Sequence, residues 1–82
     1  MGDKTEEAVR RILADQLCVE EGALTPKALL TEDLGMDSLD RVETVMRLEE
    51  DVLGGGQIDE EAAEGWMTVQ DVLDSLTKLE AR

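Results

Sequence analysis

Residues 37–53 read DSLDRVETVMRLEEDVL. Apolar side chains recur through this stretch at helical spacing, at Leu39, Val42, Val45, Met46, Leu48 and Val52. Asp37 belongs to the residue types that cap helix N-termini, and the run Gly54-Gly55-Gly56 that follows is a typical stop. The stretch therefore predicts a helix at about residues 38–53, with Ser38 in its first turn.

Other segments show the same periodicity. A first helix is expected from residue 3 to about residue 19, where the polar residues 20–22 would end it. A short acidic helix is expected at residues 58–64, and Thr68 would cap a last helix that continues to about residue 79. No strand pattern competes. We predict an all-α fold, a small four-helix bundle with three longer helices and one short helix.

The connection between the first two long helices contains Thr25-Pro26, a typical helix start that predicts one short turn through Leu30. With 82 residues, the chain is expected to form one domain, residues 1–82. The single cysteine, Cys18, cannot form an intrachain disulfide and is interpreted as a buried, inert thiol. No apolar run suits a membrane span or a signal peptide. A cytoplasmic monomer is expected.

The charge of the chain limits its partners. Lys and Arg number 8 and Asp and Glu number 21, a net charge of −13. Such a field repels phosphate backbones and anionic lipids and attracts basic protein surfaces. We therefore expect no nucleic-acid binding, and without companion Cys or His residues we expect no metal site.

Ser38 is the residue with the clearest potential for chemistry. The chain has only two serines, Ser38 and Ser75, and no histidine, so a serine paired with an imidazole base is excluded. The positive end of the helix dipole would instead favour an anionic group on the Ser38 hydroxyl. Gly35 either relieves crowding ahead of this helix or is an ordinary turn residue. The pair Asp37-Ser38 taken alone would fit a simple helix cap.

Several motifs together resemble those of acyl carrier proteins. They are EDLGMDSLD at 32–40, VE at 42–43, VM at 45–46, LEE at 48–50, Ile58, DEEA at 59–62 and TVQD at 68–71. The resemblance covers nearly the whole chain. It implies that a phosphopantetheinyl transferase (a holo-carrier synthase) attaches 4′-phosphopantetheine from coenzyme A to Ser38, between Asp37 and Leu39. The result would be a phosphoprotein that carries acyl groups as thioesters on the thiol of the arm.

The resemblance also implies partners and a pathway class. Such a chain is a non-catalytic carrier that serves acyl-transfer and chain-elongation enzymes in fatty acid, specialised lipid or polyketide biosynthesis. Residues 38–64 hold nine acidic residues and two arginines, a net charge of −7. Basic patches of partner enzymes would dock there, and the candidates are Asp40, Glu43, Glu49, Glu50 and Asp51. A merely solvated helix face is the alternative.

Two arginines interrupt this acidic helix. Arg41 and Arg47 stand at i,i+4 from Asp37 and Glu43, so we expect them to neutralise part of the charge that a partner would meet. Apolar stripes in a small bundle are core by default, but the resemblance implies a space that shelters the acyl chain. Its expected lining is Val42, Met46, Ile58, Trp66 and Met67.

Two other functions stay open at this point. The first is an acidic helical protein-interaction module that is never modified. The second is a peptidyl carrier domain, in which a second glycine is typical where this chain has Met36. The sequence does not choose the pathway or the acyl group.

Overall fold

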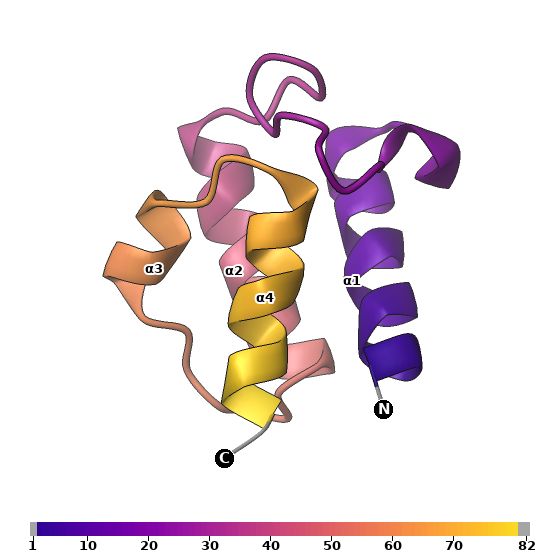
Figure 1. The fold of residues 1–82 in the computed structure, drawn as a ribbon. Coiled ribbons are helices and arrows are strands. Elements are labelled where there is room, and N and C mark those ends of the chain that lie inside the picture. Colours follow the sequence, from indigo (N-terminus) through magenta and orange to yellow (C-terminus); the bar gives the residue numbers. More distant parts are fainter. Residues whose placement is uncertain (1, 81–82) are drawn as a thin grey trace.

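The structure is a computed structural model that describes residues 2–80 (Figure 1). In chain order its helices are α1 (Gly2–Leu17), the 3₁₀ turn η1 (Glu21–Ala23), α2 (Ser38–Asp51), α3 (Glu60–Glu64) and α4 (Val69–Glu80). Helix α1 packs against α2 and α4, and the short α3 lies against α2 at the edge of the bundle. Residues 2–80 contain no strand, only one isolated bridge between Leu29 and Thr68. The predicted four-helix, all-α fold is confirmed.

Helix α1 ends earlier than predicted. It stops at Leu17 because Cys18 adopts a left-handed backbone, with φ of 56°. The N–H of Val19 then donates to the carbonyl of Ala14 at 3.0 Å, the six-to-one bond of a Schellman motif. Cys18 is exposed, so its interpretation as a buried thiol is wrong. The residue lies beyond the helix and not on its apolar face.

Two capping boxes fix the starts of α2 and α4. Asp37 accepts the N–H of Asp40 at 2.8 Å, and the Asp40 carboxylate accepts the N–H of Asp37 at 3.2 Å. Thr68 and Asp71 form the same reciprocal pair at α4, with bonds of 3.2 and 3.0 Å. The N–H groups of Met67 and Thr68 both donate to the Asp71 carboxylate, which lowers its pKa below the ordinary value of 3.8.

Helix α3 begins at Glu60, two residues later than expected, because Asp59 is its cap and accepts the N–H of Glu61 at 3.2 Å. The loop before it turns through Gly54 and Gly55, both with positive φ. The connection between α1 and α2 forms a turn at residues 25–28, where the N–H of Ala28 donates to the carbonyl of Thr25.

The core lies between the three long helices and is almost wholly aliphatic. The long α1–α2 connection contributes five buried side chains to it, Leu24, Ala28, Leu30, Leu34 and Met36. Trp66 is 3% exposed, and its indole Nε1–H donates to the Ser75 hydroxyl at 2.8 Å. The five buried side chains of the connection hold it to the bundle as far as Met36, the residue before the cap of α2.

The apolar residues of α2 do not all face this core. Leu48 is fully buried, but Leu39, Val42 and Met46 are more than half exposed. Thr44 instead faces inward at 0% exposure, and its hydroxyl has no hydrogen-bond partner. Helix α2 therefore presents an apolar strip to solvent.

Candidate functional site: the start of helix α2 and the pocket beside α3

Ser38 is the first residue of α2 and is exposed to solvent. The backbone is held on both sides of Ser38. Before it, the side chain of Met36 is buried in the core and only 2% exposed, and around it the capping box joins Asp37 to Asp40. Gly35, with φ of 78°, makes the turn that leads into this segment. Among residues 4–79, whose side chains the structure describes, none forms a hydrogen bond with the Ser38 hydroxyl. A rigid backbone thus presents a free hydroxyl.

The surroundings of this hydroxyl favour an anion and not a nucleophile. The N–H groups of Ser38 and Leu39 have no acceptor among residues 2–80, so the positive end of the helix dipole is open beside the side chain. The chain has no histidine that could act as a base toward Ser38, and the carboxylate of Asp37 accepts the Asp40 N–H as the cap of the helix. A phosphodiester attached at Ser38 would fit these donors. The described residues contain no cluster of three or more potential metal ligands.

The candidate docking acids occupy different environments. Gln16 of α1 donates from Nε2 to Glu43 at 2.6 Å and to Asp40 at 3.2 Å, and it thereby orients both carboxylates. Glu50 and Asp51 are exposed at the end of α2. Glu49 is less exposed and accepts the N–H of Ile58 at 2.8 Å, so it joins α2 to the segment before α3. Sequence reasoning missed Gln16, because its partners lie on another helix.

Both arginines bind elsewhere than predicted. Arg47 reaches α1, where Nη2 pairs with the Asp15 carboxylate at 2.9 Å and Nη1 donates to the Gln16 side-chain oxygen at 3.2 Å. Arg41 points to the other side of α2, and its Nη1 donates to the backbone carbonyls of Ala63 and Trp66 at 2.6 and 3.0 Å. The expected pairing with Asp37 and Glu43 is therefore wrong.

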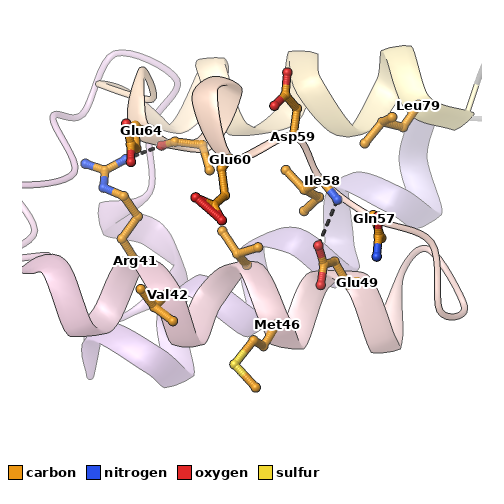
Figure 2. Close-up of a pocket in the computed structure, with 12 residues that line it drawn as sticks. Arg41, Val42, Met46, Glu49, Gln57, Ile58, Asp59, Glu60, Glu64 and Leu79 are labelled. Carbon is orange, nitrogen blue, oxygen red and sulfur yellow. Dashed lines mark hydrogen bonds between the residues drawn. The ribbon is translucent and has the colours of Figure 1, made fainter.

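A pocket of about 880 Å³ lies between α2 and the α3 segment (Figure 2). Its lining is Arg41, Val42, Val45, Met46, Glu49, Gln57, Ile58, Asp59, Glu60, Ala63, Glu64 and Leu79. Val42, Met46 and Ile58, predicted to surround a sheltered space, are among these residues. Trp66 and Met67 are not: the indole of Trp66 is turned to Ser75 and buried in the core, and Met67 is 65% exposed. The predicted lining is corrected at these two positions.

Comparison with known proteins bears on what this arrangement does. Residues 7–76 match the model of a protein family described as a phosphopantetheine attachment site. A relative from Thermosynechococcus vestitus (strain NIES-2133 / IAM M-273 / BP-1), named acyl carrier protein, is 52% identical over 68 residues, which are 83% of this chain and 82% of the relative. The chain belongs to the acyl carrier protein family.

A solved structure from Mycobacterium tuberculosis, assigned as an acyl carrier protein, is similar with a TM-score of 0.81. The two chains are 29% identical, and the match covers 92% of this chain and 97% of the other. Membership of the family implies a covalently attached 4′-phosphopantetheine, a group that supplies the thiol on which acyl chains are carried as thioesters. Carriers of this family are handled by a phosphopantetheinyl transferase and by acyl-handling enzymes in general, and they are carriers and not catalysts. No helix within residues 2–80 has the length and apolar character needed to cross a membrane.

Proposed function

We propose that Ser38 is the residue that carries the 4′-phosphopantetheine arm. The observation that carries this proposal is the contrast between the two serines. Ser38 is exposed, has a free hydroxyl and stands at a helix N-terminus that suits a phosphate group. Ser75 is half-buried, and its hydroxyl accepts the indole N–H of Trp66. Of the two serines, Ser38 is the more exposed and the one whose hydroxyl is not engaged by another side chain, which supports the assignment.

Mass spectrometry tests this assignment directly. The purified chain is incubated with coenzyme A and a broad-specificity phosphopantetheinyl transferase, and its intact mass is measured. The wild-type chain and the control Ser75→Ala gain one arm, whereas Ser38→Ala gains none. Peptide mapping that places the arm outside the Ser38 peptide refutes the assignment. A wild-type chain that never gains mass would favour the unmodified interaction module.

The surface of α2 supports a second part of the proposal, a docking face for partner enzymes. The exposed acids Glu43, Glu50 and Asp51 lie on the same helix as Leu39 and Val42, which are 64% and 56% exposed. Exposed ion pairs contribute only about 0.2–1 kcal/mol each, so the acids chiefly raise encounter rates, while the apolar strip adds contact area. Weak and rapidly reversible binding is suited to a shuttle that visits several enzymes.

Charge reversal tests the docking face. Glu50→Lys, at the exposed end of α2, should lower kcat/KM with an acyl-handling partner by raising KM, and the effect should shrink at high salt. The control is Asp74→Lys on α4, because it makes the same charge change away from α2. Equal effects of the two variants would show that net charge, and not this face, is recognised.

The proposed role is that of a carrier in fatty acid, specialised lipid or polyketide biosynthesis, and in this role the pocket beside α3 shelters the acyl chain. Its apolar lining from Val42, Val45 and Ile58 is the supporting observation. The acyl group on protein purified from its native host would identify the pathway. A monomeric state and a cytoplasmic location stay predictions.

A further inference from the structure

Arg41 lies at one end of the pocket (Figure 2), and of the residues that line the pocket it is the closest in sequence to Ser38. The two residues are three positions apart on α2, a spacing that makes them neighbours on one face of the helix. Glu64 lies at the same end of the pocket, whereas Gln57 and Leu79 lie at the opposite end. An arm attached at Ser38 therefore begins beside the Arg41 end of the pocket.

The guanidinium of Arg41 ties α3 to α2 at this end. Its Nη1 donates to the carbonyls of Ala63 and Trp66, at the C-terminal side of α3 and just beyond it. These bonds are charge-assisted and partly buried, so each is stronger than a bond between neutral groups. A helix of five residues is not stable by itself, and its position depends on such contacts.

A second tie holds the other end of the same segment. The Glu49 carboxylate accepts the N–H of Ile58 at 2.8 Å, immediately after the loop that turns through Gly54 and Gly55. The segment from Ile58 to Trp66 is thus fastened to α2 at both ends, by side chains that also line the pocket. Of the two ties, only that of Arg41 lies next to Ser38.

We propose that Arg41 is a specificity-determining residue that sets which acyl chains enter the pocket; this inference rests on the proposed attachment at Ser38. The pocket is open to solvent, but Ile58 and Ala63 in its lining are each only 5% exposed, so an acyl chain contacts them fully only when α3 moves away from α2. That movement breaks the bonds from Arg41 to Ala63 and Trp66. Each buried methylene adds to the driving force for entry. A short acyl chain buries too little surface to offset the lost bonds and stays outside, while a longer saturated chain enters.

Amide hydrogen exchange of the unloaded protein tests the tie without any acyl chain. Arg41→Met keeps the aliphatic length and removes the donors, and it should accelerate exchange of the Ala63, Gly65 and Trp66 amides by about tenfold or more. The control is Arg47→Met, the same change on the same helix, whose bonds go to α1; exchange in α3 should stay within about twofold of the wild type. Unchanged exchange in Arg41→Met overturns the inference.

Selection by chain length is tested on protein loaded at Ser38 with butanoyl or octanoyl phosphopantetheine. In the wild type only the octanoyl form should shift the NMR methyl signals of Ile58 and Ala63, whereas in Arg41→Met the butanoyl form should shift them as well. The same length threshold in both proteins overturns the inference. If Arg41→Met does not fold, Arg41→Lys, which keeps the charge but has fewer donors, should give intermediate exchange. A wild-type chain that never gains the arm refutes the proposed function instead, and intact mass shows this before any NMR spectrum.

Discussion

Thr44 offers a quantitative test of the packing of α2. Its side chain is fully buried, and within residues 4–79 its hydroxyl is the one buried side-chain polar atom that has no hydrogen-bond partner. Replacement by valine keeps the branched shape and substitutes a methyl group for the hydroxyl. A buried polar group without a partner destabilises a protein by about 1–3 kcal/mol. Thr and Val have nearly the same helix propensity, so the backbone contributes little to the difference.

We expect Thr44→Val to raise the free energy of unfolding by about 1–2 kcal/mol, since the methyl group also has to fit a packed site. For a domain of this size each kcal/mol corresponds to about 4–8 °C in Tm. Urea unfolding followed by the fluorescence of Trp66 measures the change, because this tryptophan is the only one in the chain and is 3% exposed when folded. Ionic strength has to be held constant, because a net charge of −13 makes stability depend on salt.

The control for this substitution is Thr77→Val, the same chemical change at an exposed position of α4. It should alter stability by less than about 0.5 kcal/mol. An unfolding midpoint for Thr44→Val at or below that of the wild type, with an unchanged urea dependence, would refute the reasoning. It would show that the buried hydroxyl is satisfied and contributes to stability.

Three other predictions test the backbone and the caps. Cys18→Gly should raise the free energy of unfolding, measured in urea, by about 0.5–1 kcal/mol, because glycine adopts the left-handed φ without strain. The greater entropy of glycine in the unfolded chain offsets part of this gain. Gly35→Ala should destabilise by about 1 kcal/mol through its φ of 78° alone, since open space surrounds it, whereas Gly22→Ala, also in open space but without a positive φ, should be close to neutral. The pKa of Asp71 is lowered in the folded chain, so its contribution to stability is present above pH 3.8 and is lost as the pH falls through the lower folded pKa. In urea unfolding between pH 3 and 6, the free energy of unfolding should therefore depend less on pH for Asp71→Asn than for the wild type.

The sequence predicts the starts of the long helices better than the ends. Asp37 and Thr68 predict the starts of α2 and α4, because the two residues of a capping box are only three positions apart and can be recognised in the sequence. The end of α1 has no such local signal. A left-handed residue that closes a helix is usually glycine, and here Cys18 takes this conformation, so that the helix ends at Leu17 without a typical stop.

In the candidate site, too, the features set by neighbouring residues were predictable from the sequence, and those set by contacts between helices were not. The exposure of Ser38 follows from its place in the first turn of α2, which local sequence specifies. The partners of Arg41 and Arg47 lie on α3 and α1, and an i,i+4 rule within one helix does not detect them. The orientation of Trp66 depends on how α4 brings Ser75 to the indole N–H, so its absence from the pocket was visible only in three dimensions.

The placement of the two arginines changes what the acidic helix offers to a partner. Arg47 forms an ion pair with Asp15 of α1, and Arg41 donates to carbonyls, so within residues 2–80 neither arginine pairs with a carboxylate of α2. Gln16, a neutral side chain, orients Asp40 and Glu43 without removing their charge. The arginines therefore fasten α2 to the helices on either side of it. The acids of α2 stay free of ion pairs with these arginines, and long-range attraction of a basic partner depends on the net charge of −7 that residues 38–64 keep.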